Sequence, residues 1–345
     1  MITISSYGRQ TSLYLLEALE TNIFSKQIKN VGIINWWWLT PEERTPANIE
    51  SFVSQQDLCI FFSEEIVDCH SGYDFALIKE VMDKYNVYYL LFSDCGITRQ
   101  LPRHRVKQFP WFVKTKLTIP ETFRADIDYR KKPFDFNLLL GSEKNPRNLI
   151  YRALQNNNKI YSTYFGHPVY RDKSMSMHEE QQVIELLSNQ PDNQKLNTMV
   201  HLECGHEANS ISHIVPKNIY DNTHFDIVTE TQYVEHQYFT TEKTAKPLAT
   251  GRWFCFFNSA NTIAYLNAYG FDFGSYLGTY DNQTNQIDRL NLLLELVDEV
   301  TSNQSFVKEI YSTTKDARLH NMYQYQKCVN IYKIELAEWL SHVSS

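Results

Sequence analysis

The chain has 345 residues, of which 43% are hydrophobic and 14% aromatic, and its formal net charge at pH 7 is -7. This length allows two domains of ordinary size, each with a sizeable hydrophobic core. The mean hydropathy of -0.42 is typical of a soluble protein, and no apolar run approaches the roughly 20 residues needed to cross a bilayer. The acidic balance, with a pI near 5.9, counts against a nucleic-acid-binding surface that covers the whole protein.

The start of the chain and its cysteines predict a cytoplasmic protein that is not bound to a membrane. Met1 to Ser6 lack a basic segment followed by a hydrophobic stretch, so we expect no secretion signal. The six cysteines have no CxxC spacing, and several lie in apolar runs. This pattern favours reduced thiols in the core over disulfides or a metal site.

Residues 1–130 alternate short strands with helical patterns. Strands are expected at Ile2 to Ser5, Val31 to Trp37, Leu58 to Phe62 and Val87 to Phe92. Helical periodicity appears between them, in TSLYLLEALETNIF and YDFALIKEVMDKY. Such alternation predicts a parallel, three-layer α/β domain. The basic, proline-bearing stretch from Arg124 to Pro133 is the expected linker to a second domain.

Residues 131–310 repeat the alternation and form the expected second domain. A strand from Phe134 to Leu140 is followed by a Gly-Ser turn and by a helix that starts near Pro146. Residues 311–345 have apolar positions at helical spacing and predict a C-terminal helix.

The run from Phe225 to Phe271 carries the clearest functional signal. It predicts a buried strand that ends at Glu230, a short helix capped by Thr240 or Thr241, and a second buried strand, WFCFF. Ligands of open α/β sheets bind at the carboxyl ends of the strands, and the N-terminus of a helix favours anions. A diphosphate is therefore expected near Glu242, Lys243 and Lys246. The alternative is a purely structural helix cap.

The same run resembles the donor-binding segment of GT-B glycosyltransferases, especially fucosyltransferase-like and phage-encoded types. The matching residues are Val228-Thr229-Glu230-Thr231, Phe239-Thr240-Thr241-Glu242-Lys243-Thr244, Lys246-Pro247-Leu248, Gly251 and Tyr269-Gly270-Phe271. The resemblance implies two Rossmann-like domains facing a central cleft. The acceptor domain would be 1–130, the donor domain 131–310, and the helix in 311–345 would pack back on the first domain.

The resemblance also implies roles for individual donor-binding residues. Glu230 and Glu242 would accept hydrogen bonds from ribose or sugar hydroxyls, and Lys243 would contact the diphosphate of a nucleotide-sugar. Lys144 and Arg147 would approach the phosphates from the opposite side, because positive charge stabilises the leaving nucleoside diphosphate; alternatively they are solvated residues at a helix start. Ala245 replaces a frequent aromatic residue, and the strand after Gly251 is unusually aromatic. The resemblance implies that these departures would change the shape of the base pocket relative to that of the family.

A reaction that inverts the anomeric centre also needs a general base. Asp94 and the pair Asp68 and His70 rank highest because they follow expected strands of the first domain, although each is individually more often a cap or a loop residue. Arg9 could contact an anion in the cleft. Because GT-B enzymes neutralise the diphosphate with side chains and helix dipoles, no essential metal is expected.

The sequence gives a weaker indication of the acceptor than of the donor. Arg103, Arg105 and Lys107 precede the aromatic stretch Phe109 to Phe112, and basic residues interleaved with aromatics can grip phosphates and an extruded base. Double-stranded DNA with hydroxymethylated bases is one expected acceptor; in that case the enzyme would act in the cytoplasm of a phage host. The alternatives are a solvated loop before a buried strand, a glycan or protein acceptor, an inactive GT-B-like binding protein, and a different enzyme with a phosphate ligand.

Overall fold

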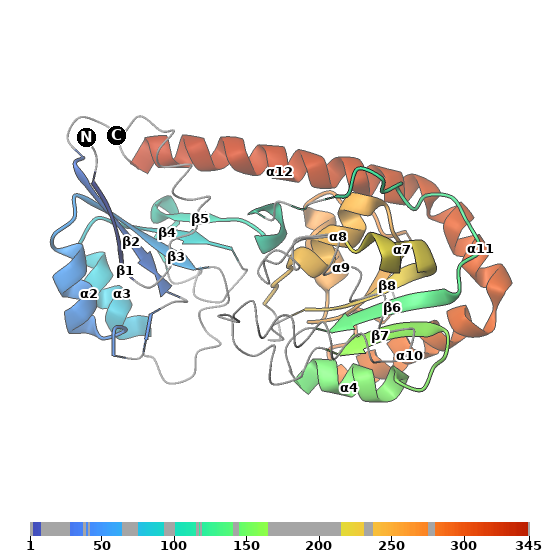
Figure 1. Cartoon of the computed structure of the whole chain (residues 1–345). Coiled ribbons are helices and arrows are strands. Elements are labelled where there is room, and N and C mark those ends of the chain that lie inside the picture. Colours follow the sequence, from blue (N-terminus) through green and yellow to red (C-terminus); the bar gives the residue numbers. More distant parts are fainter. Residues whose placement is uncertain are drawn as a thin grey trace, which may run out of the picture. The chain divides into compact units, whose positions relative to one another are not determined.

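The computed structural model gives the fold shown in Figure 1. It describes residues 3–7, 28–36, 39–40, 42–63, 75–92, 101–114, 117, 119–140, 145–164, 215–230, 237–274 and 280–343. The described chain is mixed α/β, with one parallel sheet of five strands and another of four.

The chain divides into two compact units. Unit 1 comprises Met1–Lys114, Gln237–Phe239 and Cys328–Ser345, and unit 2 comprises Thr115–His236 and Thr240–Lys327. The first boundary therefore follows Lys114, whereas the sequence indicated a boundary near residue 130. The reason is that the segment after Thr115 packs within unit 2, as described below for Asp126 and Lys132.

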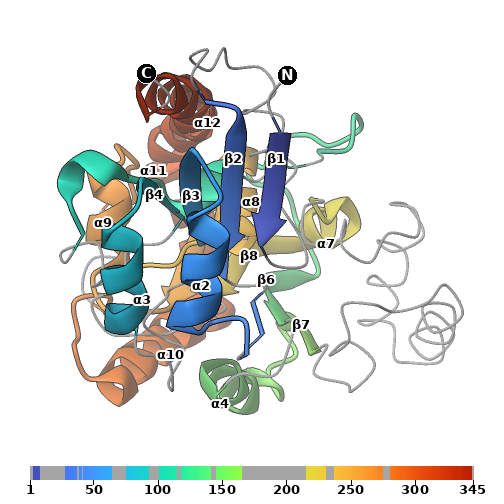
Figure 2. The same ribbon diagram turned by 90° about the vertical axis from the view of Figure 1, so that its left-hand side faces the viewer.

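The sheet of unit 1 runs in chain order. Its strands pair in parallel as β1-β2-β3-β4-β5, with the bounds β1 Thr3–Tyr7, β2 Asn30–Asn35, β3 Leu58–Ser63, β4 Val87–Leu91 and β5 Val106–Gln108. Successive right-handed crossovers in one direction leave their helices on one face. Accordingly, α2 (Pro46–Val53) and α3 (Phe75–Asp83) lie side by side against the sheet in Figure 2. Two short 3-10 helices, Arg103–Arg105 and Trp111–Lys114, flank β5.

The end of the last helix completes the core of unit 1. Helix α12 spans Lys315–Val343, and its residues from Cys328 onward belong to unit 1. The ring of Tyr332 packs against Phe92 and Phe109 with centroid distances of 5.8 and 4.8 Å, and Trp339 packs against Tyr88 at 6.2 Å. In these pairs the apolar positions of the C-terminal helix cover residues in and after β4 and β5.

In the sheet of unit 2, the second strand lies on one side of the first strand and the later strands lie on its other side. Its strands pair in parallel in the order β7-β6-β8-β9, with the bounds β6 Phe134–Leu140, β7 Ile160–Tyr164, β8 Thr223–Thr229 and β9 Phe254–Phe257. The first strand, β6, thus has β7 on one side and β8 on the other. Such a reversal of the strand order is a topological switch point, and ligands of open α/β sheets bind beside it at the carboxyl ends of the strands.

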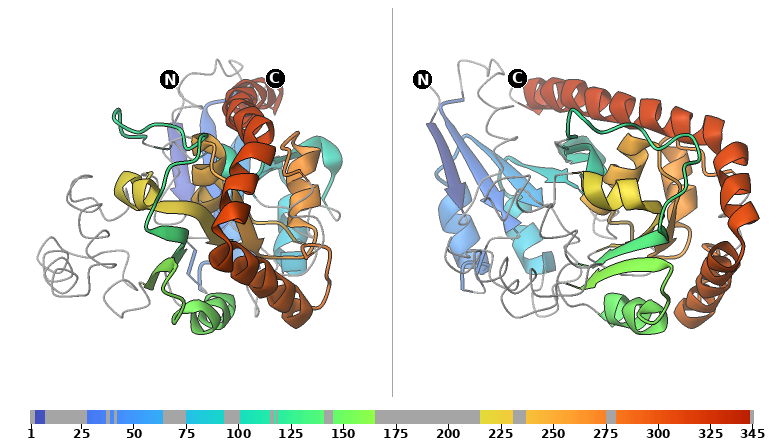
Figure 3. Two further views of the ribbon diagram at one scale, coloured as in Figure 1. Left: turned by 90° about the vertical axis from the view of Figure 1, so that its right-hand side faces the viewer. Right: turned by 45° about the vertical axis from the view of Figure 1, so that its right-hand side comes forward.

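Helices connect and extend this sheet; they are α4 Asn145–Leu154, α7 Lys217–Asn222, α8 Glu242–Thr250, α9 Thr262–Ala268, α10 Gln286–Ser302 and α11 Gln304–Thr313. Figure 3 shows α11 on the side where β6 and β8 begin. The Tyr311 hydroxyl on α11 donates a hydrogen bond of 3.4 Å to the carbonyl of His224 in β8. The amino edge of the sheet is thereby covered by helix, whereas Glu230 and the start of α8 follow the carboxyl edge.

Candidate functional site

The candidate site lies where β8 ends and α8 begins, beside the switch point of unit 2. All seven residues of β8 are buried, as expected of a central parallel strand. Glu230 follows directly and is 3% exposed. We call Glu230, Thr241, Glu242, Lys243 and Thr244 the switch-point cluster.

Glu230 binds the start of α8 from within the protein. One carboxylate oxygen accepts the backbone N–H of Thr241 at 2.8 Å and the hydroxyl of Thr244 at 2.5 Å. The other oxygen accepts the hydroxyl of Thr241 at 2.6 Å. Burial raises the pKa of Glu230, and the nearby Lys243 ammonium opposes that shift.

Glu242 and Lys243 form a largely buried ion pair in the first turn of α8. The Lys243 Nζ lies 2.6 Å from Oε1 of Glu242, and the two side chains are 20% and 11% exposed. Burial alone would raise the pKa of Glu242, but Lys243, with a smaller contribution from Lys246, lowers it to about 2. Glu242 is therefore ionised at neutral pH, and an ionised carboxylate accepts hydrogen bonds from hydroxyl groups.

The local sequence explains why α8 stands here. Thr241 is its N-cap, in extended conformation, and its hydroxyl accepts the N–H of Lys243. Gly251 is the C-cap, with a left-handed φ of 68°, which a glycine adopts without steric cost. The cap that the sequence indicated is present, but the N–H groups of Thr241 and Lys243 are bonded to protein oxygens.

Of the two cations expected on the opposite side, the structure describes Arg147. It lies on α4, the helix that follows β6, and is 1% exposed. Lys144 lies outside the described residues, as do the candidate bases Asp68, His70 and Asp94 and the candidate cleft residue Arg9.

The basic residues expected to bind an acceptor lie in and before β5 in unit 1. Lys107 pairs with Glu335 of α12 at 2.5 Å, and its Nζ lies 4.9 Å from the centre of the Phe109 ring. Arg105 donates to the carbonyl of Tyr85 at 3.1 Å. Arg103 is exposed, as is its neighbour His104. Two of the three predicted residues thus make contacts within unit 1.

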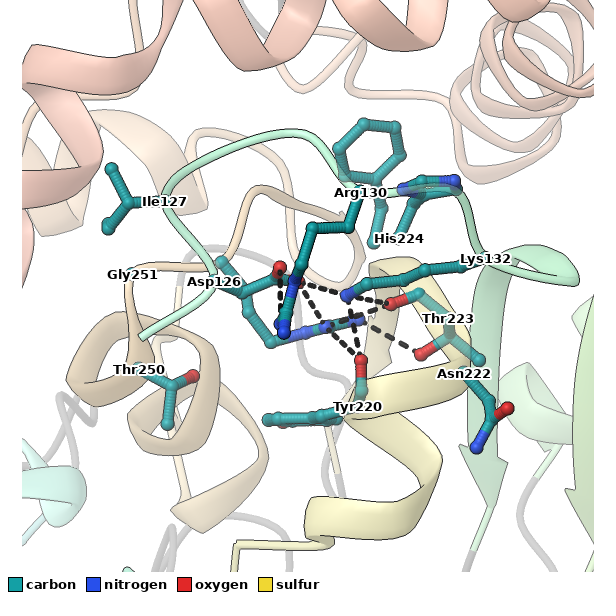
Figure 4. Close-up of polar contacts among 12 residues, drawn as sticks. Asp126, Ile127, Arg130, Lys132, Tyr220, Asn222, Thr223, His224, Thr250 and Gly251 are labelled. Carbon is teal, nitrogen blue, oxygen red and sulfur yellow. Dashed lines mark hydrogen bonds and ion pairs between the residues drawn. The ribbon is translucent and has the colours of Figure 1, made fainter. Parts of the chain in front are cut away.

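A second polar cluster occupies the amino edge of the same sheet in unit 2, and local sequence gave no indication of it. In this buried ion cluster, Asp126 accepts the Nζ of Lys132 at 2.6 Å and Nη1 of Arg252 at 2.7 Å. Arg252 also reaches Asp226 in β8 at 2.5 Å. Lys132 donates to the carbonyls of Tyr220 and Thr223 as well, as Figure 4 shows.

These contacts revise the role of the stretch from Arg124 to Pro133, which the sequence indicated as a linker. Burial and the neighbouring Arg252 lower the pKa of Lys132 to about 8, while Asp126 opposes the shift. The buried ion cluster lies where the strands begin, and its charges are paired with one another. Its role is therefore structural: it holds these segments of unit 2 together. The order of the charges along the chain does not show that Asp126 and Lys132 are buried while Asp128 and Arg130 are exposed.

In the part of the chain that the structure describes, no group of three or more His, Cys, Asp or Glu side chains is arranged to hold a metal ion. Within that same part, no helix is both long and apolar enough to cross a membrane. Comparison of the chain with protein-family models, with curated proteins and with solved structures gave no match.

Proposed function

We propose that this protein is a glycosyltransferase of the GT-B type and that unit 2 binds its nucleotide-diphosphate sugar donor. One observation carries the proposal. The end of β8 and the first turn of α8, joined by Glu230 and Thr241, lie beside the switch point of a parallel sheet, the position at which such sheets bind ligands. The resemblance of the same residues to a donor-binding segment supports this assignment.

The charges of the switch-point cluster suit a nucleotide-sugar. The ionised carboxylate of Glu242 can accept hydrogen bonds from the vicinal hydroxyls of a ribose. Lys243 and Lys246, whose charges both act on Glu242, can bind the diphosphate. In the transfer step, positive charge placed beside the diphosphate stabilises the leaving group as its bond to the sugar breaks.

Under this proposal the acceptor hydroxyl is activated by a side chain of unit 1, with Asp94 and the pair Asp68 and His70 as candidates. A hydroxymethylated base of double-stranded DNA is the acceptor we propose to test first. Arg103 supports it as an exposed cation beside β5. The internal pairing of Lys107 with Glu335 limits the basic surface available there.

The experiment is a calorimetric titration with UDP-, GDP- and CMP-sugars, followed by donor hydrolysis with and without hydroxymethylated DNA. We expect Glu242→Gln and Lys243→Met each to weaken the binding of the preferred donor by ten-fold or more. The matched control is Lys217→Met, which removes another partly exposed lysine of unit 2 that is paired with a carboxylate on its own helix. Absence of binding for every donor would refute the proposal, and binding without turnover would point to a binding protein.

A further inference from the structure

Resting on the proposed function, we propose that Glu230 is a positioning residue. It fixes the first turn of α8, so that Glu242 and Lys243 face the donor, and it makes no contact with the donor itself. Glu230 and Glu242 therefore have different roles, although the sequence indicated that both accept hydrogen bonds from the donor.

The first ground is that the hydrogen bonds of Glu230 are made inside the protein. Its carboxylate accepts one backbone N–H and two hydroxyls, all from Thr241 and Thr244. Bonds to an ionised acceptor are shorter and stronger than neutral ones, so their exchange for ligand hydroxyls would gain little. At 3% exposure, Glu230 also has almost no surface to offer.

The second ground is the electrostatics of the helix start. The N-terminus of a helix attracts an anion, and at α8 that anion is the Glu230 carboxylate. The next two N–H groups also have partners, because that of Glu242 bonds its own carboxylate and that of Lys243 is directed to the Thr241 hydroxyl at 3.4 Å. An incoming diphosphate therefore meets the side chains of Lys243 and Lys246 and not the backbone of the helix.

The third ground is that Glu230 and Glu242 differ in their surroundings although they lie close together. Each carboxylate feels the charge of Lys243, but Glu242 pairs directly with its Nζ at 2.6 Å. Glu242 thus has a charged partner that a ligand can share. Glu230 has two threonines, and both belong to the first turn that it holds.

The test compares substitutions that keep or remove the acceptor geometry. In Glu230→Gln the side-chain oxygen can still accept from Thr241 and Thr244, and the amide group can donate to the Thr241 hydroxyl. We expect this variant to bind the preferred nucleotide-sugar within about three-fold of the unsubstituted chain. Glu230→Ala should weaken binding by at least ten-fold and speed hydrogen exchange at the amides of Thr244 and Ala245. Glu242→Gln should weaken binding equally while leaving that exchange unchanged.

If Glu230→Gln weakens binding as much as Glu242→Gln, Glu230 contacts the donor and the inference is overturned. A double-mutant cycle of Glu230→Ala with Thr241→Ala tests the anchor without any ligand. We expect strong coupling in the melting temperatures, with the double variant close to the worse single variant, whereas additive effects would also overturn the inference. Failure of the proposed function is distinguishable, because the unsubstituted chain would then bind no nucleotide while the exchange and coupling data still decide whether Glu230 anchors α8.

Discussion

Asp126 and Arg252 lie 126 positions apart in the chain, yet the Asp126 carboxylate and the Arg252 guanidinium meet at 2.7 Å. Their side chains are 2% and 0% exposed. Because Arg252 also binds Asp226 and the carbonyls of Tyr220 and Thr223, the pair ties the segment before β6 to the beginnings of β8 and β9. It therefore closes the amino edge of the sheet in unit 2.

We expect Asp126→Ala to destabilise unit 2 by about 3–5 kcal/mol, because it leaves the buried charges of Lys132 and Arg252 without their shared partner. The control is Asp128→Ala, two residues along the same segment. Asp128 pairs with Lys315 at 2.7 Å, but its side chain is 78% exposed, and exposed ion pairs contribute little. The measurement is the free energy of unfolding of both variants in urea. Equal losses in the two variants would contradict the structural role of Asp126.

Gly251 is required by its backbone and by its neighbours. At a φ of +68°, a Cβ would lie 2.5 Å from Cδ1 of Ile127 and 2.6 Å from Sδ of Met322. We expect Gly251→Ala to cost about 2–4 kcal/mol, from left-handed strain and overpacking together. Gly274 has a similar φ of +62° with nothing within 4 Å, so Gly274→Ala should cost about 1 kcal/mol. The measurement is the melting temperature of each variant. Both substitutions carry the left-handed strain, so the additional loss in Gly251→Ala measures the overpacking.

Thr241→Ala should cost about 2–4 kcal/mol, more than an ordinary helix cap. It removes the cap of α8 and one of the three donors that satisfy the buried Glu230. The matched control is Asn285→Ala, which removes an exposed cap on α10 that accepts two N–H groups and should cost about 1 kcal/mol. Similar losses in chemical denaturation would show that Glu230 does not depend on the Thr241 hydroxyl.

The stability of unit 2 should depend on pH through Asp281. This carboxylate is 2% exposed, and burial raises its pKa from 3.8 to about 6, although the N–H groups of Ile263 and Thr262 oppose the shift. A carboxyl whose pKa is raised in the folded state favours folding while it is protonated. Its contribution is therefore complete below pH 3.8 and is lost as the pH rises through about 6, on the order of 3 kcal/mol in total.

We expect Asp281→Asn to remove this dependence, because an amide does not titrate in this range. The hydrogen bond is kept, since the amide oxygen can accept the Ile263 N–H that lies 2.8 Å from the carboxylate in the parent chain. The measurement is the free energy of unfolding at pH 4 and pH 7 in both proteins. Relative to the parent chain, the variant should gain stability between those two values. An unchanged difference at the two pH values would contradict the prediction.

Much of the local structure could be predicted from residue patterns. The apolar run from Phe134 to Leu140 is β6 with those bounds, and WFCFF contains β9, Phe254–Phe257. Thr241 and Gly251 cap α8 as their residue types indicated. These features depend on neighbours in sequence, through hydrophobic period, capping hydrogen bonds and the φ that glycine allows.

The candidate site could be predicted in its residue types but not in its contacts. Glu230, Glu242 and Lys243 were identified together, yet nothing in the sequence distinguishes the carboxylate that binds Thr241 at the start of α8 from the one that pairs with Lys243. The buried ion cluster was missed for a related reason. The local partners of Asp126 are Lys132 and the exposed Arg130, and Arg252 and the Tyr220 carbonyl reach the cluster from distant positions.

The sequence by itself thus determined the α/β alternation, the caps of α8 and the residue types at its start, because these follow from interactions within a few residues. Tertiary structure decided the order of the strands and with it the switch point beside Glu230. It also decided that Asp126 and Lys132, within the expected linker, are buried in the ion cluster. Strand order and charge pairing depend on which distant segments meet, and that is settled by packing and desolvation over the whole of unit 2.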